Sequence, residues 1–363
     1  MKNTFGQSIS ITLFGESHGD AIGVTVDGLT PGIIVDESFI ASQLEKRKGV
    51  SNISTKRREG DNIRILSGVF EGKTTGTPLT MMIENENQHS NDYSLTKDLA
   101  RPGHADYTAQ CKYHGFQDYR GGGHFSGRIT APLVAAGAIA IKMLEIKGIK
   151  ILTHIISCGG ISDRDICDFD TDYKYISDSD IPVLDVQTGE KIKDYIAKAA
   201  AEGDSVGGKL ETVVIGMPAG VGEPWFDSVE SMLSHILFSV PAVKGVEFGS
   251  GFDFCNMFGS VANDCFRMAE DKIVTQTNNN GGINGGITNG MPIVFKCAVK
   301  PTPSIYKEQK TVDFVKCENA DILIKGRHDP AIIHRAAVVV SSVTALCLCD
   351  ILAQRFGTDY FAE

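Results

Sequence analysis

Four of the nine histidines stand in glycine-flanked loops. They are His18 in GESHG, His104 in RPGHAD, His124 in RGGGHFSGR and His328 in KGRHDP. Glycine lets a backbone come close to a ligand, and imidazole is the side chain best suited to proton transfer near neutral pH. One such histidine alone is as often a turn residue bonded to a backbone carbonyl. Four together predict a site that moves protons.

Basic residues gather in loops of the same kind. Between Glu45 and Glu59 the chain carries six bases, and four further arginines lie beside glycines. Such a loop is usually a solvated surface in isolation, but this chain has a formal charge of −10. Because the planar fork of arginine suits carboxylate and phosphate groups, the pattern predicts a polyanionic ligand. The bases are Lys46, Arg47, Lys48, Lys56, Arg57, Arg58, Arg101, Arg120, Arg128 and Arg327.

Two further loops have the composition of ligand cradles. The stretch Asn278 to Gly290, NNNGGINGGITNG, offers many backbone N–H groups, which can hold a phosphate or the edge of a flat ring. A flexible surface loop is an equally good reading of that stretch alone. Lys300 to Ser304, KPTPS, adds a stiff turn with a lysine and two hydroxyls.

Composition excludes several classes of protein. With 45 acidic residues against 35 basic ones, the chain is a poor candidate for binding nucleic acid or an anionic membrane. Its nine cysteines show no C-x-x-C spacing, which favours a reducing, cytoplasmic location. The start, MKNTFGQSIS, has no apolar signal core. The apolar runs 131–141 and 336–349 are shorter than the ~18 residues that span a bilayer, so they predict buried helices.

These residues must be positioned by a mixed set of elements. Alternating apolar residues predict strands at 8–14, 21–27, 63–70, 78–83, 149–157, 209–217 and 293–299. No strict β-α-β order appears, and no G-x-G-x-x-G follows a strand, so a Rossmann domain is not expected. No Pro- or Ser-rich linker divides the chain. We therefore expect one α+β domain over residues 1–363.

Helix boundaries carry the clearest local signals. Asp36 is placed to cap a helix over 37–48, and a second helix is expected from Thr130 to Gly148. Asp227 and Glu230 have capping-box spacing before a strongly amphipathic helix. Asp329 is expected as the N-cap of a long apolar helix, with Pro330 at its first position. Helices are also expected at 106–113 and 190–202. His154 and His235, on an expected strand and helix, should matter through folding alone.

The loops also occur in a specific order. GESHG, SGVFEGKTTGTP, RPGHADYT, DYRGGG, SVGG, AVKGVEFG, GGINGGI, KPTPSI and GRHDP follow one another from Gly15 to Pro330. Each motif is modest, but nine in this order make the sequence resemble the chorismate synthase family over essentially the whole chain.

The resemblance implies a fold and a reaction. It implies a sandwich of helices between antiparallel sheets, assembled as a homotetramer. The family substrate is 5-enolpyruvylshikimate 3-phosphate, which loses phosphate and a ring hydrogen in a 1,4-anti elimination that gives chorismate, in the shikimate pathway of aromatic amino acid biosynthesis. Reduced FMN is required although no net redox change occurs. NADPH enters only as a reductant of the flavin, and no metal is implied.

Site residues follow from the resemblance by position. His18 matches the histidine near the leaving phosphate, His104 the one that protonates reduced flavin, and Asp329 the carboxylate that relays a proton from flavin N5. Ser17 and Ser126 match hydroxyls near the flavin. Arg47, Arg128 and Arg327 match anion-binding positions. Flavin-contacting positions are His124, Phe125, Ser126, Pro241, Ala242, Gly285, Lys300, Pro301, Thr302, Pro303, Ser304 and Arg327.

The sequence departs from the family pattern in three places. KRKGVSN stands where many members read R-R-x-P-G-x-S-R, so a proline is missing and Asn52 replaces an arginine. GGGHFSGR replaces G-G-G-R-S-S-A-R, and Pro241 stands where asparagine is frequent. The proton-transfer histidines are unaffected, but contacts to the FMN phosphate and to a nicotinamide are put in question.

Two other readings use the same residues. A metal-dependent phosphatase or lyase could use the histidines and Asp329, although the chain has no H-E-x-x-H and no paired-cysteine spacing. A non-catalytic flavin or nucleotide carrier would bind flavin without releasing phosphate. Neither accounts for the ordered motifs.

Overall fold

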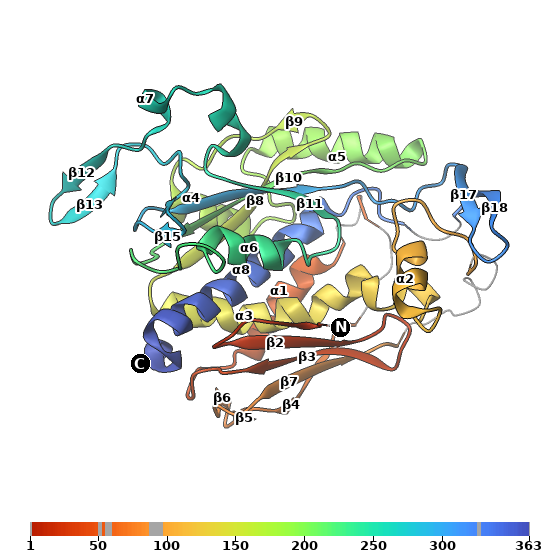
Figure 1. Cartoon of the computed structure of the whole chain (residues 1–363), viewed down its shortest axis with the longest axis horizontal. Coiled ribbons are helices and arrows are strands. Elements are labelled where there is room, and N and C mark those ends of the chain that lie inside the picture. The colour runs from red at the N-terminus through yellow and green to blue at the C-terminus, as the bar shows by residue number, and fades with distance from the viewer. Residues whose placement is uncertain (1, 50–52, 55–59, 87–96, 325–327, 363) are drawn as a thin grey trace.

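Two five-stranded antiparallel sheets enclose a layer of helices in the computed structural model, which describes residues 2–49, 53–54, 60–86, 97–324 and 328–362 (Figure 1). The first sheet has the order β1(Thr4–Phe5), β2(Ser10–Gly15), β3(Ala21–Asp27), β7(Leu79–Glu84), β4(Ile63–Ser67). The second has the order β11(Val243–Phe248), β16(Ile293–Val299), β10(Gly208–Ile215), β8(Lys150–Cys158), β9(Ile161–Ser162). The expected α+β sandwich is confirmed.

The helices between the sheets form the centre of the core. They are α1(Glu37–Arg47), α3(Thr130–Ile146), α6(Val229–Leu237) and α8(Ile333–Phe356). The α3 and α8 helices pack directly on each other, and Gly137 is the point of closest approach. A Cβ there would lie 2.3 Å from the Cβ of Ser342, so only glycine allows this helix spacing.

Both central helices are apolar along most of their length. The segments Gly127–Ile146 and Ile333–Phe356 have the length and composition of membrane spans, but 78% and 94% of their most apolar windows are buried inside the protein. Burial against the two sheets accounts for that apolar character. The runs that the sequence assigned to buried helices are therefore confirmed as such.

Two helix caps differ from their sequence predictions. The α8 helix begins at Ile333 rather than Pro330, and its N-cap, Ile332, makes no side-chain bond, so the predicted capping role of Asp329 is wrong. The carboxylate of Asp329 pairs instead with Arg335, in the first turn of the helix. In α6 the N-cap is Ser228, whose hydroxyl accepts from the backbone N–H of Ser231, and not Asp227. The Asp36 cap of α1 is confirmed.

Smaller elements surround this frame. The α5 helix begins four residues before its predicted start because Asp185 caps it. That helix covers Val186–Ala201. The remaining α-helices are α2(Asp106–Tyr113), α4(Phe169–Ser177) and α7(Gly259–Ala262). The 3₁₀ turns are η2(Arg120–Phe125), η3(Gly127–Ile129), η4(Gly251–Asn256) and η5(Thr358–Phe361). The hairpins are β5(Val69–Phe70) with β6(Lys73–Thr74), β12(Phe266–Ala269) with β13(Lys272–Thr275), β14(Ile283–Asn284) with β15(Ile287–Thr288), and β17(Gln309–Asp313) with β18(Glu318–Ile322).

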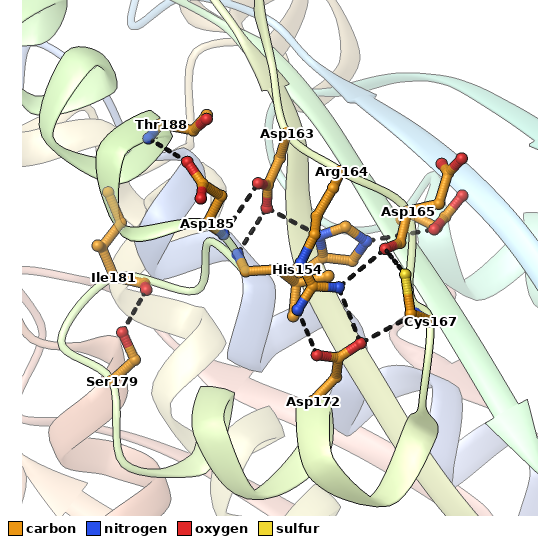
Figure 2. A network of polar contacts seen from close by, with 12 residues as sticks. His154, Asp163, Arg164, Asp165, Cys167, Asp172, Ser179, Ile181, Asp185 and Thr188 are labelled. Atoms are coloured by element: carbon orange, nitrogen blue, oxygen red, sulfur yellow. Dashed lines mark hydrogen bonds and ion pairs between the residues drawn. The ribbon is translucent and has the colours of Figure 1, made fainter.

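The second sheet carries a buried polar network around His154 and Asp163 (Figure 2). On β8, Nε2 of His154 lies 3.2 Å from Oε1 of Glu211 on β10, and Nδ1 lies 3.6 Å from Oδ2 of Asp163. Asp163 also accepts from the backbone N–H groups of Leu184 and Asp185, so it fixes the start of α5. The acidic segment from β9 to the start of α5 is therefore anchored to the sheet.

Candidate functional site

A cavity of about 270 Å³, hereafter the small cavity, lies where α1, α3, α8 and the glycine-rich loops meet. Its described lining is rich in charged side chains. They are His18, Arg47, Lys48, Asp61, Arg128, Asp329 and Arg335, with Ser17, Ser126 and Thr130 as hydroxyl groups. Four of the five predicted catalytic residues are thus brought together with two of the predicted anion-binding arginines. The four are Ser17, His18, Ser126 and Asp329, and the arginines are Arg47 and Arg128.

His18 is held deep in the wall of this cavity. Its side chain follows β2 directly and is 5% exposed, and Nδ1 lies 3.1 Å from Oγ of Ser17. Gly121 covers the ring so closely that a Cβ there would lie 2.1 Å from Cε1 of His18, in a backbone conformation with φ +57°. The glycines of RGGG therefore let two loops meet around one imidazole.

Two buried arginines share one carboxylate. Asp61 accepts from Nη2 of Arg47 at 2.7 Å through one oxygen and from Nη1 of Arg128 through the other. Burial alone would raise the pKa of Asp61, but the two guanidiniums outweigh it and hold that pKa below its usual range. Nε of Arg128 also donates to Asn85, whose amide donates to the carbonyls of Glu16 and Gly19. The arginines are thereby tied to the loop of His18.

Asp329 is connected to the same network through Arg335. It forms an ion pair with Arg335 of α8, and Nε of Arg335 donates to the backbone carbonyl of Arg47 at 2.8 Å. Arg335 therefore connects the carboxylate of Asp329 to the end of α1. The Asp329 side chain is 13% exposed, so it remains accessible from the cavity.

A larger cavity of about 830 Å³, hereafter the groove, adjoins the small cavity. The two share part of their lining, namely Gly121, Ser126, Gly127, Thr130, Val240, Pro241 and Ile332. The groove is further lined by His104, His124, Phe125, Ala242 and Pro303, and by the bases Arg101, Lys244 and Lys300. A ligand that fills both spaces would contact most of the predicted residues at once.

His104 lies in a rigid corner of the groove. Its Nε2 lies 2.7 Å from Oγ of Ser304, and Nζ of Lys300 donates to the carbonyl of Gly103 at 2.6 Å. Burial, followed by the charge of Arg101, lowers the pKa of His104 to about 4. The imidazole is therefore neutral at physiological pH in the ligand-free protein.

The departures at His124 and Phe125 have distinct local roles. Nδ1 of His124 donates to the carbonyl of Gly15 at 2.7 Å, which binds the RGGGHFSG loop to the end of β2. Phe125 is 44% exposed in the groove, edge-on to Tyr113 of α2 at 6.0 Å between ring centroids. The ring of His124 thus fixes the loop in place, and Phe125 offers a flat apolar surface.

Ala242 has an uncommon backbone conformation for its type. Its φ is +76°, and its carbonyl accepts from the backbone N–H of Lys300 at 3.0 Å. A non-glycine residue in this region is strained and persists where surrounding contacts hold it. The bond to Lys300 joins the Pro241–Ala242 turn to the KPTPS turn, so two predicted ligand-contacting segments form one wall.

The remaining predicted residues lie behind or away from the linings. Ser304 bonds His104 but lies outside both sets of lining residues, as do Pro301 and Thr302. Oγ1 of Thr302 is buried without a hydrogen-bond partner. Gly285, at the turn of the β14–β15 hairpin, lines neither cavity. Arg327, Asn52 and Lys56 lie outside the described residues.

The asparagine–glycine loop has its own internal bonds. Asp264 accepts from the backbone N–H groups of Asn279 and Asn280, and the side chain of Asn278 accepts from Gly282 N–H. These three backbone N–H groups, which the sequence offered to a phosphate, are therefore already bonded. His328 likewise lies outside both linings, packed on Tyr306 at 5.6 Å between ring centroids, with a buried Nε2 that has no partner.

Sequence reasoning missed Asp61, Arg335 and Asn85. A signal was present for two of them, since Asp61 is an acid directly after a basic stretch and Arg335 is a lone arginine near the start of a long apolar run. Nothing local distinguishes Asn85. His235 also lines the far end of the groove, so its position no longer indicates a role in folding alone. Within the described ranges, no group of three or more His, Cys, Asp or Glu is arranged to hold a metal ion.

Comparison with known proteins covers nearly the whole chain. The family model described as chorismate synthase matches residues 9–353. Among curated proteins, the chorismate synthase of Methanobrevibacter smithii is 47% identical over 351 residues, covering 96% of both chains. That of Thermococcus gammatolerans is 45% identical over 355 residues, covering 96% of this chain and 97% of its own. That of Lachnoclostridium phytofermentans is 48% identical over 353 residues, covering 96% of this chain and 95% of its own.

A solved structure extends the likeness to three dimensions. A crystal structure of chorismate synthase superposes with a TM-score of 0.77 at 28% sequence identity, covering 97% of this chain and 94% of that one. The arrangement of sheets and helices is therefore that of a known enzyme fold.

Proposed function

Because the chain belongs to the chorismate synthase family, we propose that it converts 5-enolpyruvylshikimate 3-phosphate to chorismate by 1,4-anti elimination of phosphate and a ring hydrogen. The observation that carries this proposal is the union of the two cavities. His18 and Asp329 lie in the small cavity, His104 lies in the groove, and Ser126 and Pro241 line both. Such a site can hold a substrate beside a large cofactor.

The charges of the small cavity suit this substrate. It carries two carboxylates and one phosphate, and Arg47, Arg128 and Arg335 with Lys48 line the space that would receive them. Arginine binds both kinds of group through paired hydrogen bonds. In a buried site these fixed charges stabilise the negative charge that develops on the departing phosphate.

The groove fits reduced FMN. Its volume lies in the usual range for cofactor sites, Phe125 offers a face for a flat ring, and Arg101, Lys244 and Lys300 offer charge for a phosphate. Reduced FMN, when bound, would supply electron density to the allylic system as phosphate leaves.

The chain's own residues would then position groups and move protons. His18, whose Nδ1 lies 3.1 Å from Oγ of Ser17, would give a proton to the leaving phosphate. His104, with Nε2 bonded to Ser304, would exchange a proton with the ligand through Nδ1. Asp329 accepts a proton while Arg335 keeps its carboxylate in place. Ser126 contacts both ligands from the shared wall.

Further parts of the proposal follow from family membership. The enzyme would act as a carbon–oxygen lyase in the shikimate pathway, in the cytoplasm, with NADPH only as a reductant of the flavin. One continuous hydrophobic core supports a single domain over residues 1–363. A homotetramer is supported by exposed apolar side chains on the arm from η4 to β13, among them Phe252, Phe258 and Ile273.

An anaerobic assay of phosphate release tests the function. With reduced FMN the protein should release phosphate from the substrate and form chorismate, without stoichiometric oxidation of flavin. Apo-protein verified to be free of flavin should release none. Equal rates with and without flavin would contradict the proposal, and so would flavin binding with no phosphate release at all.

A further inference from the structure

The central feature of the small cavity is a carboxylate placed between two arginines. Asp61 is 2% exposed, and the side chains of Arg47 and Arg128 are 5% and 8% exposed. Each guanidinium donates to a different oxygen of Asp61. Asp61 comes from the segment before β4, whereas the arginines come from the end of α1 and from η3, so the tertiary fold assembles this triad.

The triad faces the space that would hold phosphate. Among the described lining residues, four bases accompany two acids, and both acids are paired with arginines. Buried arginines without a competing carboxylate bind phosphate strongly, because charge-assisted bonds gain strength away from water. Inorganic phosphate is a product of the proposed reaction, and it must leave the cavity before the next substrate binds.

We propose that Asp61 is a resident competitor for phosphate, whose carboxylate holds down the affinity of the small cavity for that anion and so allows its release. This inference rests on the proposed function for the identity of the departing anion. Asp61 acts through Arg47 and Arg128 and touches no reacting atom, so it is a positioning residue.

The alternative role for Asp61 predicts the opposite change in phosphate affinity when the carboxylate is removed. If the carboxylate served only to hold the arginines in place, its removal would disorder them and weaken phosphate binding. Arg128, however, also donates a hydrogen bond to Asn85. Arg47 is buried at the end of α1, where the residue is 4% exposed. The arginines therefore stay in the cavity without Asp61, and one fewer negative charge beside them strengthens their attraction for phosphate.

Calorimetric titration of ligand-free protein with inorganic phosphate decides between the two. Asp61→Asn keeps the shape and removes the charge, and it should tighten phosphate binding by about tenfold or more. Asp172→Asn is the matched control, since Asp172 is also a buried aspartate bonded to an arginine, Arg164, but lines neither cavity. That control should leave the phosphate Kd unchanged. Unchanged or weaker binding in Asp61→Asn overturns the proposal.

A second variant guards against loss of folding. If circular dichroism shows that Asp61→Asn is unfolded, the double variant Asp61→Asn/Arg47→Gln replaces it. This variant removes one negative and one positive charge, so the net charge of the triad stays as in the wild type. A competitor role predicts that this protein binds phosphate at least as tightly as the wild type, despite one arginine fewer. Clearly weaker binding by the folded double variant shows that the triad is only a scaffold.

Turnover separates this inference from the proposed function. Phosphate added to the assay should inhibit Asp61→Asn at concentrations about tenfold lower than the wild type. Because the calorimetric test needs no turnover, a wild-type protein that fails to convert the substrate would reject the function and leave the phosphate result standing. Tighter phosphate binding without stronger product inhibition would overturn the role in release.

Discussion

Nε2 of His104 lies 2.7 Å from Oγ of Ser304, although 200 residues separate the two in the chain. The contact joins the RPGHAD loop to the KPTPS turn, and the bond from Lys300 to the carbonyl of Gly103 reinforces it. Two motifs that the sequence offers separately thus form one corner of the groove. The imidazole is fixed in orientation by a hydroxyl rather than by a carboxylate.

Replacing His104 by alanine should lower kcat by roughly 10-fold to 10⁴-fold, the usual range for a lost proton donor with its positioning. Ser304→Ala should give a smaller loss in the same direction, because the ring remains but loses its fixed orientation. Steady-state kinetics with reduced FMN in excess measures both. A folded His104→Ala protein with full activity would show that this histidine is structural.

The ionisation of His104 gives a second test. Burial and Arg101 lower its pKa to about 4, below the ordinary value of 6.5. The unfolded chain therefore binds more protons between those values, so this group's contribution to stability is present above pH 6.5 and is lost as the pH falls through about 4. Proton NMR of the ligand-free protein should show the His104 signal unchanged from pH 8 to pH 5. A midpoint near 6.5 would contradict the buried site.

The network of His154 should affect stability and not the chemistry. Burial opposes protonation of His154, but Asp163 and Glu211 outweigh it and raise the pKa above 6.5. Its contribution to stability is therefore full below pH 6.5 and is lost as the pH rises through the raised pKa. His154→Gln should cost about 1–3 kcal/mol at pH 6, because Glu211 and Asp163 each lose a buried contact but keep other partners.

Urea unfolding at pH 6 and pH 9 measures this effect. The difference in stability between wild type and His154→Gln should shrink at the higher pH, while kcat per folded molecule stays the same at both. An equal difference at the two pH values would show that the histidine is neutral in the folded protein. A loss of kcat in the folded variant would place His154 in the reaction.

The parts of the fold that sequence predicts well are those set by local pattern. The β16 strand matches its alternation over Ile293–Val299, and α1 begins after Asp36 as its cap indicates. The start of α8 failed because the capping pattern at Asp329 is identical whether the carboxylate bonds its own helix or the distant side chain of Arg335. Only the tertiary arrangement selects between these partners, and here the ion pair prevails.

The site shows the same division. Glycine-flanked histidines at 18, 104 and 124 all reach the cavities, because glycine spacing signals close approach of loops. Asp61 escaped notice because its meaning depends on two arginines from other elements. The asparagine–glycine loop had the right composition for a cradle, but Asp264 uses its N–H groups. The composition of a loop shows which hydrogen-bonding groups it contains, but it does not show which of them are already bonded to other parts of the protein.

Arg335 should prove important although it belongs to none of the motifs from which the site was predicted. Arg335→Gln removes the partner of Asp329 and the bond to the carbonyl of Arg47. A lost charge-assisted bond costs about 1.5–3 kcal/mol, so kcat/KM should fall by roughly 10-fold to 150-fold. Arg355→Gln, in the last turn of the same helix and outside both cavities, is the control and should change kcat/KM little. Equal effects of the two substitutions would remove Arg335 from the site.

The departure at Asn52 poses a question that the basic loop itself can answer. Asparagine cannot neutralise a phosphate or carboxylate, so a neighbouring cation must bind the anion that an arginine binds in many relatives. Lys48 is in place for this, since it lines the small cavity while its Nζ lies 2.6 Å from Glu45. Lys56, the other candidate, lies outside the described residues. We expect Lys48 or Lys56 to compensate.

Substrate Kd in three variants decides this last prediction. Lys48→Ala or Lys56→Ala should weaken binding by roughly 10-fold to 150-fold, the effect of losing a charge-assisted hydrogen bond. Asn52→Arg should be neutral or harmful, because a second cation would meet a lysine that already serves the anion. Lys2→Ala, which removes a base from the far end of the groove, controls for net charge. Normal binding in both alanine variants, together with binding at least tenfold tighter in Asn52→Arg, would show that the arginine slot is open and that no lysine fills it.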